Sequence, residues 1–545
     1  MLNGMMMDQP LLLSSVIEYA AETHPHAQIV SARVEGDIHS YGYAEARARI
    51  IQLAHALRDM GVQPGDRVAT LAWNTHRHFE LYYAIAGIGA VCHTINPRLF
   101  PDQLTYIANH AEDQVMFFDT TFAPLVAELR AQWPEGMKLV ALCDASTMPT
   151  IDGLADTLCY EALLKGRATT IDWPQFDENT AAALCYTSGT TGEPKGALYS
   201  HRSNVLHSLF CIAGGFDSLG QGRRIMPVVP LFHANSWGLT YSAALAGSSI
   251  VFPGAKLDGE SVFALMDSQE VYSSWGVPTV WLGLIDAMKK HGRKPNGLSE
   301  IVVGGSAASR SMIETFERDF GVNVIHAWGM TEMSPIGTLG KLEPDMEARS
   351  FDQRMDLKAT QGRRMYGVDL KIVDEAGARL PHDGEAFGEL FVRGPAVIRG
   401  YYNNEEATKK AFDAEGWFGT GDVAKITPEG FLVLVDRTKD LVKSGGEWIS
   451  SIDVENAASA HPGVANCAVI GIPHPKWVER PLLIVVPRAG AQPDKASILA
   501  LLATSLAKWQ MPNDVVFVDE IPLTATGKIS KMTLRERFKD HEIAD

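Results

Sequence analysis

One stretch of eleven residues combines glycines, hydroxyl side chains and a lysine in an order that suits a polyphosphate. Residues 186–196 read Tyr-Thr-Ser-Gly-Thr-Thr-Gly-Glu-Pro-Lys-Gly. Glycines let the backbone turn tightly, and successive backbone N–H groups form a nest that binds anions. The hydroxyls add hydrogen-bond donors, and Lys195 adds a positive charge. The stretch therefore predicts a phosphate-binding loop.

The loop differs from a Walker A motif, in which serine or threonine follows the lysine. Here Lys195 stands between Pro194 and Gly196. Residues 181–185 before the loop are uncharged and long enough for one buried strand. We therefore expect a strand that ends in the phosphate loop. The other reading of the same residues is a Ser/Thr/Gly-rich connection with no ligand.

Length and charge limit the function classes. A chain of 545 residues predicts more than one domain. Its net charge of −17 argues against a nucleic-acid partner, because such proteins are normally basic. Residues 437–545 contain 13 basic and 13 acidic residues, so the whole net charge lies in residues 1–436. Any site for an anionic cofactor must be locally basic against that background.

The cysteines and the N-terminus predict a cytoplasmic protein. Six cysteines are scattered without CxxC spacing, which is typical of reduced thiols and predicts no zinc site. No basic residue precedes Arg33, so the charged start of a signal peptide is missing. The longest apolar runs, such as residues 81–91, are too short to span a bilayer.

The elements that position the loop alternate between strands and helices. Residues 12–60 predict helices around a small strand. Strands are then expected at 67–71, 91–95, 115–118 and 138–142, with a helix at 78–89. Similar units recur after the loop, and a strand at 322–326 leads into a second motif. This pattern predicts an α/β fold with largely parallel sheets.

The pattern changes twice toward the C-terminus. From residue 366 it becomes β, with alternation at 388–394 and a turn before residues 431–435. After a charged cluster at 436–440, strands at 467–471, 482–486 and 515–518 accompany a helix at 495–509. We therefore expect a boundary at about 437–440, followed by a small α+β domain.

The phosphate loop resembles that of the adenylate-forming superfamily, which includes acyl-CoA synthetases, luciferases and peptide-synthetase adenylation domains. The resemblance extends over essentially the whole chain, with motifs in the family's order. These motifs occupy residues 186–196, 230–237, 326–332, 388–402, 417–422, 436–440, 443–450 and 522–528. It implies an N-terminal adenylation domain of several subdomains at 1–436, a hinge at 437–440 and a mobile C-terminal lid domain at 441–545.

The resemblance implies a site for ATP and Mg²⁺. In the family, the aromatic residue of the second motif stacks on adenine, and Trp328 replaces the usual tyrosine. Thr331 would bond the α-phosphate, and Glu332 would share Mg²⁺ with Thr187, since this hard cation prefers oxygen ligands. The ribose would bind the carboxylate of Asp422, with Arg437 beside it.

The resemblance also implies two half-reactions with CoA as the second substrate. Lys528 would bridge the substrate carboxylate and the α-phosphate, where a cation reduces the repulsion between two anions. Lys439 stands at the hinge position. The loop 443–450 would face the active site while CoA displaces AMP from the acyl-adenylate.

The candidate residues form three overlapping sets. The candidate catalytic residues are Lys528, His233 and Glu332. The candidate cofactor residues are Thr187, Ser188, Gly189, Thr190, Thr191, Gly192, Lys195, Gly304, Ser306, His326, Ala327, Trp328, Gly329, Met330, Thr331, Asp422, Arg437, Lys439, Lys443, Ser444, Gly445, Gly446, Glu447, Trp448 and Lys528. The expected acyl pocket is short and apolar, and its candidate lining is His233, Trp237, Gly304, Gly305, Met330 and Pro335.

Within the superfamily, the chain resembles ligases that join 3-(methylthio)propionate to CoA, so we expect that acid and short-chain fatty acids as substrates. The alternatives are a medium-chain fatty-acid–CoA ligase, an adenylating enzyme that loads a carrier protein, a luciferase-like oxygenase and a non-catalytic binding protein. The glycine-rich 443–450 loop favours the ligase, and intact Lys195, Glu332 and Lys528 argue against a non-catalytic protein. Relatives are often homodimers, and we expect the same here.

Overall fold

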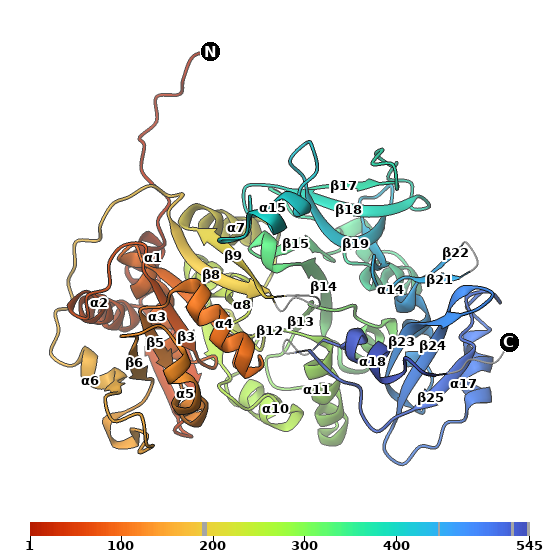
Figure 1. The fold of residues 1–545 in the computed structure, drawn as a ribbon, viewed down its shortest axis with the longest axis horizontal. Helices are drawn as coiled ribbons and strands as arrows, with labels where there is room; N and C mark the ends of the chain where they lie inside the picture. The colour runs from red at the N-terminus through yellow and green to blue at the C-terminus, as the bar shows by residue number, and fades with distance from the viewer. Residues whose placement is uncertain (188–192, 445–446, 525–527, 542–545) are drawn as a thin grey trace.

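The computed structural model describes residues 1–187, 193–444, 447–524 and 528–541. Its N-terminal part contains three sheets, and a fourth sheet forms the C-terminal domain. Figure 1 shows the N-terminal sheets on the left, centre and top, and the C-terminal domain on the right. The predicted α/β fold, with a large N-terminal domain and a small α+β domain, is confirmed.

The first sheet has seven strands in the order β7-β6-β5-β3-β4-β8-β9. All its pairings are parallel except β8 with β9. Its strands are β3 (Arg67–Leu71), β4 (Val91–Thr94), β5 (Val115–Phe118), β6 (Lys138–Ala141), β7 (Leu158–Cys159), β8 (Ala181–Thr187) and β9 (Lys195–Ser200). Its helices include α3 (His76–Gly87), α4 (Pro101–Ala111), α5 (Ala123–Leu129), α6 (Tyr160–Leu164) and α7 (His201–Ala213). The phosphate loop thus joins the only antiparallel pair of this sheet among the described residues.

The second sheet has nine strands in the order β16-β15-β14-β13-β12-β10-β11-β1-β2. Its central pairings are parallel, and its edges are antiparallel. Its strands are β1 (Gln28–Ala32), β2 (Ile38–Gly42), β10 (Arg224–Pro227), β11 (Ser249–Phe252), β12 (Ser273–Gly276), β13 (Glu300–Val303), β14 (Asn323–Gly329), β15 (Ile336–Leu339) and β16 (Arg363–Arg364). Its helices include α1 (Leu13–Thr23), α2 (Tyr43–Asp59), α9 (Leu239–Ala246), α10 (Gly259–Ser268), α11 (Pro278–His291), α12 (Arg310–Glu314), α13 (Pro344–Glu347) and α14 (Phe351–Ala359). The short segment labelled α8 (Ala234–Trp237) is a left-handed turn.

The third sheet is antiparallel and has the order β17-β18-β19-β20. Its strands are β17 (Asp369–Val373), β18 (Phe387–Arg393), β19 (Phe418–Ile426) and β20 (Leu432–Arg437). Helix α15 (Glu405–Ala411) lies between β18 and β19 in the chain. The expected change to β structure after residue 366 is therefore confirmed.

The C-terminal domain contains the sheet β22-β21-β24-β23, with β25 parallel to β24. Its strands are β21 (Val442–Ser444), β22 (Glu447–Ile449), β23 (Val464–His474), β24 (Val478–Pro487) and β25 (Asp514–Phe517). Its helices are α16 (Ser451–Ser459), α17 (Lys495–Leu502) and α18 (Lys531–Arg537). Two small hydrophobic cores lie on this sheet.

Two sequence predictions were wrong in detail. The small strand expected within residues 12–60 is a pair, because β1 and β2 form an antiparallel hairpin. The helix expected at 495–509 ends at Leu502. There the hydroxyls of Thr504 and Ser505 donate to the carbonyls of Leu501 and Leu502. Such local bonds compete with the helical ladder.

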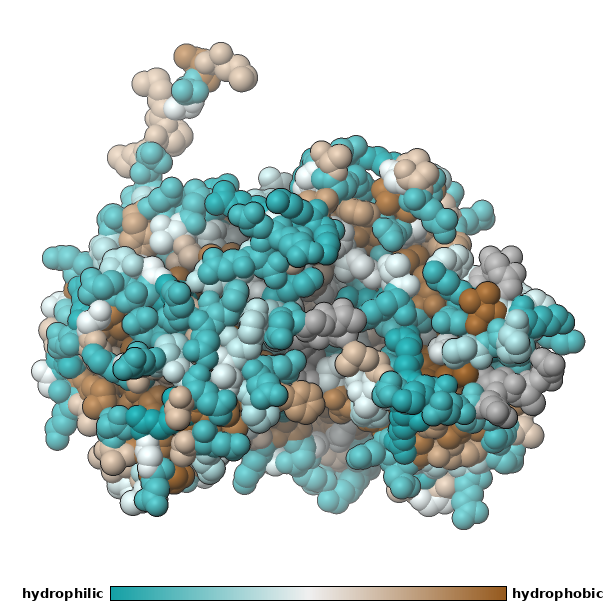
Figure 2. Space-filling view, viewed as in Figure 1, coloured by the Kyte–Doolittle hydropathy of each residue, from teal (hydrophilic) through white to brown (hydrophobic). Residues whose placement is uncertain are grey.

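The chain begins with an extended segment that leaves the body of the protein (Figure 2). Its large apolar side chains are exposed. They are Met1, Leu2, Met5, Met6 and Met7. Across the described ranges, no helix is long and apolar enough to cross a membrane. All six cysteines are free thiols.

Candidate active site

The β8–β9 hairpin places both ends of the phosphate loop side by side. Thr187, the last residue of β8, pairs with Lys195, the first residue of β9. The side chains of Thr187 and Lys195 therefore belong to directly opposite residues of the two strands. The candidates Ser188, Gly189, Thr190, Thr191 and Gly192 lie outside the described residues.

A turn from the third sheet's subdomain reaches the same place. The Tyr401 hydroxyl donates to Oε1 of Glu332 over 2.7 Å. The Lys195 ammonium lies 5.2 Å from the centroid of the Tyr401 ring. Glu332 is buried, and this burial raises the pKa of its carboxyl group, while the bond from Tyr401 opposes the rise.

The expected metal site was tested against these donors. No cluster of three or more His, Cys, Asp or Glu side chains that could hold a metal ion occurs in the described ranges. Mg²⁺, however, is usually held by one or two carboxylates together with substrate phosphates and water. The buried Glu332 carboxylate, linked through Tyr401 and Lys195 to the strand that ends at Thr187, fits that mode of binding.

Asp422 is held between two donors from distant parts of the chain. Nε1 of Trp328 donates to Oδ2 over 3.0 Å, and Nε of Arg437 lies 2.7 Å from Oδ1. Burial raises the pKa of the Asp422 carboxyl group, and Arg437 opposes the rise. Because each carboxylate oxygen has two lone pairs, both can still accept a ribose hydroxyl. Trp328 thus orients Asp422, the candidate residue for binding the ribose, through its indole N–H.

Lys528 reaches this site from the C-terminal domain. Its Cε atom lies 3.7 Å from the position that a Cβ would take at Gly305. Burial and the charge of Arg437 lower the pKa of Lys528 to about 8, and Asp422 and Glu332 oppose this shift. The Thr524 N–H donates to the Lys528 carbonyl over 2.6 Å.

The candidate acyl residues gather beside Lys528. Four successive residues, 234–237, have positive φ, and this left-handed turn carries Trp237. The indole approaches Gly304 so closely that a Cβ there would lie 2.8 Å from Trp237 Cη2. Gly305 has a φ of +79°, and a Cβ there would lie 3.8 Å from Trp237 Cζ2. Trp237 is also buried in the main core, so its ring serves both packing and the candidate pocket.

His233 precedes that turn and faces the same lysine. Burial, followed by the charge of Lys528, lowers the pKa of His233 to about 3. The imidazole is therefore neutral at pH 7. It can donate or accept a hydrogen bond there, but it supplies no positive charge.

The second motif packs closely against Pro335 at the end of β14. Gly329 permits a close approach, because a Cβ there would lie 2.2 Å from the Pro335 carbonyl oxygen. The Met330 N–H donates to the same carbonyl over 3.0 Å. Thr331 is buried, and its carbonyl accepts the Tyr199 hydroxyl. Met330 and Pro335 therefore lie on one short loop.

Two further candidates in β14, His326 and Ala327, contact the neighbouring loop at residues 304–308. His326 is buried, and its Nε2 accepts the Ala308 N–H over 3.3 Å, so it steadies the loop that contains exposed Ser306. The Ala327 carbonyl oxygen lies 3.1 Å from the Cβ position of Gly304.

The candidate CoA loop lies apart from this group. Lys443 Nζ is 4.6 Å from the centroid of the Trp448 ring, within the β21–β22 hairpin. Ser444 is buried, and its hydroxyl accepts from Arg480 over 2.8 Å. Figure 1 shows the hairpin at the outer edge of the C-terminal domain, away from β14. Gly445 and Gly446 lie outside the described residues, and Glu447 begins β22.

The expected hinge at 437–440 begins where β20 ends, at Arg437. Asp436 is buried, and its Oδ2 accepts the Ser451 N–H over 2.7 Å. Arg535 donates to Asp440 over 2.7 Å and to the carbonyl of exposed Lys439 over 3.2 Å. In this arrangement of the two domains, Lys528 lies beside Gly305.

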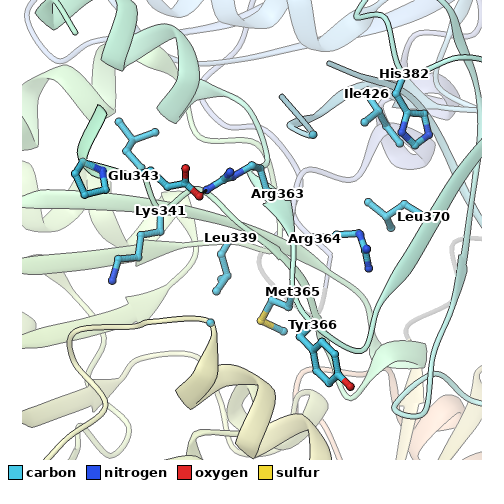
Figure 3. Close-up of a pocket in the computed structure, with 14 residues that line it drawn as sticks. Leu339, Lys341, Glu343, Arg363, Arg364, Met365, Tyr366, Leu370, His382 and Ile426 are labelled. Carbon is cyan, nitrogen blue, oxygen red and sulfur yellow. Dashed lines mark hydrogen bonds and ion pairs between the residues drawn. The ribbon is translucent and has the colours of Figure 1, made fainter. Parts of the chain in front are cut away.

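A separate groove of about 580 Å³ contains none of the candidate residues (Figure 3). It lies between the β15–β16 region and the third sheet, and Leu339, Met365 and Tyr366 contribute its apolar lining. Its cations are already paired, Arg363 with Glu343 over 2.7 Å and Lys341 with Asp217 over 3.0 Å. The groove is therefore distinct from the candidate active site.

Fold and site together define a class. A buried acid beside the end of the expected phosphate loop, the buried carboxylate of Asp422 and a lysine from the C-terminal domain lie at one place, as expected for an enzyme that adenylates a carboxylate. The AMP-binding enzyme family matches residues 17–402, and the AMP-binding enzyme C-terminal domain matches residues 453–528.

Individual relatives agree with this class. A 3-methylmercaptopropionyl-CoA ligase of Ruegeria lacuscaerulensis is 48% identical over 98% of this chain and 99% of its own. A medium-chain-fatty-acid–CoA ligase of Ectopseudomonas oleovorans is 45% identical, and the match covers 98% of each chain. ATP-bound MatB from Rhodopseudomonas palustris has 27% identity and a TM-score of 0.80, over 97% of this chain and 99% of that one. The chain belongs to the AMP-binding enzyme family and is an AMP-forming acyl-CoA ligase that works through an acyl-adenylate.

One contributor to the site was missed at the level of sequence. Tyr401 lies in the 388–402 motif, for which no role was predicted from the sequence. Its signal is the Gly-Tyr-Tyr pattern at 400–402, and its contacts with Lys195 and Glu332 join residues far apart in the chain.

Proposed function

We propose that the enzyme joins 3-(methylthio)propionate and short-chain fatty acids to CoA, with Mg·ATP as the energy source. The observation that carries this substrate range is the Trp237 indole against Gly304 and Gly305, next to Lys528. A bulky ring at that position leaves room for a short acyl chain whose carboxylate meets the lysine. The relative named for 3-methylmercaptopropionate, which is the same acid, supports the proposal.

In the proposed first half-reaction, Lys528 binds the substrate carboxylate and the α-phosphate together. Its charge reduces the repulsion between the two anions and stabilises the negative charge that builds on the phosphoryl oxygens. Asp422 accepts the ribose hydroxyls, and Lys195 binds phosphate oxygens. A magnesium ion, held by Glu332 and Thr187, would neutralise phosphate charge when bound. Neutral His233 orients the acid without repelling Lys528.

In the proposed second half-reaction, the C-terminal domain turns about residues 437–440. This rotation withdraws Lys528 and brings the 443–450 loop to the acyl-adenylate, where CoA displaces AMP. Two observations support the division of labour. Lys528 lies beside Gly305, whereas the β21–β22 hairpin, which contains Lys443 and Trp448, lies at the outer edge of its domain (Figure 1).

A medium-chain fatty-acid–CoA ligase is the second candidate, because a relative with that name is 45% identical over 98% of the chain. A panel of carboxylic acids assayed for CoA-dependent AMP formation separates the two. The proposal expects 3-(methylthio)propionate, butyrate and pentanoate to be used at similar rates, and octanoate poorly. A clear preference for octanoate would favour the second candidate. The homodimer expected from the resemblance stays a prediction.

A further inference from the structure

Tyr401 stands between two side chains of opposite charge. Its hydroxyl donates to Glu332 over 2.7 Å, and its ring lies 5.2 Å from the Lys195 ammonium. The charge of Lys195 acts on the Glu332 carboxylate, yet the two side chains form no ion pair in the described part of the chain. The distance between ammonium and ring is within the usual range for a cation–π contact.

The backbone of Tyr401 is fixed from both sides. Its N–H donates to Oγ1 of Thr408 over 2.9 Å, and it forms an antiparallel bridge with Ala197, two residues after Lys195. The next residue, Tyr402, donates its N–H to the Gly196 carbonyl over 2.8 Å. The turn is therefore tied directly to the start of β9.

The same turn is tied to the acid as well. The Ile398 N–H donates to the Glu332 carbonyl over 2.9 Å, and the Ser334 hydroxyl donates to the Ala396 carbonyl over 2.8 Å. Residues 396–402 thus connect β9 with the loop that contains Glu332. Tyr401 contacts both charged side chains, and its own backbone is fixed by bonds that do not involve either of those side chains.

We propose that Tyr401 is a positioning residue that keeps Lys195 and Glu332 apart and aims each at the metal–triphosphate. The hydroxyl orients the carboxylate, and the ring seats the ammonium. Without the ring, the lysine and the acid would neutralise each other when no nucleotide is bound, and ATP would have to break that pair. The inference rests on the proposed roles of Glu332 at the metal and Lys195 at the phosphates.

The roles of the hydroxyl and the ring are separable by substitution. Tyr401→Phe removes the hydroxyl and keeps the ring, whereas Tyr401→Leu removes both. The control is Tyr402→Phe, which removes the neighbouring hydroxyl on the same turn and leaves the backbone bond to Gly196 in place. Equilibrium ATP binding is measured by calorimetry with saturating Mg²⁺ and again in EDTA, and thermal unfolding reports on the fold.

The expected pattern follows from the two contacts. Tyr401→Phe should lower the gain in ATP affinity from Mg²⁺ about tenfold, because hydrogen bonds to charged groups are among the stronger ones. Its affinity in EDTA should stay within about twofold of wild type, since Lys195 keeps its ring. Tyr401→Leu should lose affinity in EDTA as well. Tyr402→Phe should match wild type in both conditions.

A double-mutant cycle separates positioning from general packing. In a Glu332→Gln background, Tyr401→Phe should have little further effect on the metal-dependent gain, because the carboxylate it orients is gone. An equal effect in both backgrounds would overturn the inference, and so would a Tyr401→Phe protein with the wild-type gain. If wild type itself gained no ATP affinity from Mg²⁺, the proposed metal role of Glu332 would fail, and the inference would fail with it.

Discussion

Replacing Lys528 by arginine is expected to remove a pH dependence that wild-type adenylation shows. Burial and Arg437 lower the pKa of Lys528 to about 8, from a usual value of 10.5. The proposed step needs the ammonium form, so activity should be present below this pKa and should be lost as pH rises through it. About nine-tenths of the lysine is charged at pH 7 and about one-tenth at pH 9.

The magnitude follows from these fractions. The kcat/KM for ATP, which reports on the free enzyme, should fall about tenfold between pH 7 and pH 9. A lysine with its usual pKa would give almost no fall over this range. Bound ATP and carboxylate add negative charge near the ammonium, so the fall in kcat should occur at higher pH than the fall in kcat/KM.

The assay is acid-dependent exchange of pyrophosphate into ATP without CoA, measured from pH 6.5 to pH 9.5. Lys528→Arg should be slower than wild type at pH 7, because a guanidinium does not reproduce the ammonium geometry. Its profile should nevertheless be flat to pH 9, since arginine stays charged. Lys528→Ala should lose about 10²–10³ in rate at pH 7. A flat wild-type profile, or an arginine variant with the wild-type basic limb, would refute the reasoning.

Three further substitutions test the other parts of the site. Lys439→Pro should spare pyrophosphate exchange and slow thioester formation, because proline restricts the φ torsion that a hinge must change; unchanged thioester synthesis would move the hinge elsewhere. Glu332→Gln should raise the Mg²⁺ concentration needed for half-maximal turnover, because a neutral amide is a poorer ligand for a hard cation; a wild-type Mg²⁺ titration would remove Glu332 from the metal site. Trp237→Ala should improve octanoate relative to butyrate, and the kcat/KM ratio of the two acids checks this. One methylene more or less in the acid changes kcat/KM by about 10–200-fold at most. Dodecanoate is too long for a short pocket, so a wild-type preference for it would refute the short pocket.

The sequence predicted what depends on local pattern. Alternation of apolar segments located β3, β5 and the change to antiparallel structure after residue 366. The uncharged run before the expected phosphate loop located β8, which ends at Thr187 and pairs with β9 from Lys195. These features could be predicted because the burial of a strand and the residues of a turn depend on the sequence within a short window.

Contacts between residues far apart in the chain could not be predicted from such local patterns. The bond from Trp328 to Asp422 joins residues 94 positions apart, and Tyr401 meets Glu332 across 69 positions. Nothing in either segment alone indicates its partner. The neutral state of His233 is of the same kind, because its lowered pKa comes from burial and from a lysine in another domain. Such properties arise only when the chain is folded.

If Lys528 serves adenylation alone and the small domain turns before CoA reacts, loss of this lysine should affect only the first half-reaction. The most direct measurement supplies preformed acyl-adenylate and CoA to Lys528→Ala and to wild type in a single turnover. Rates of thioester formation should be nearly equal, while pyrophosphate exchange in the variant should be about 10²–10³ slower. Equal losses in both half-reactions would show that Lys528 does not serve adenylation alone.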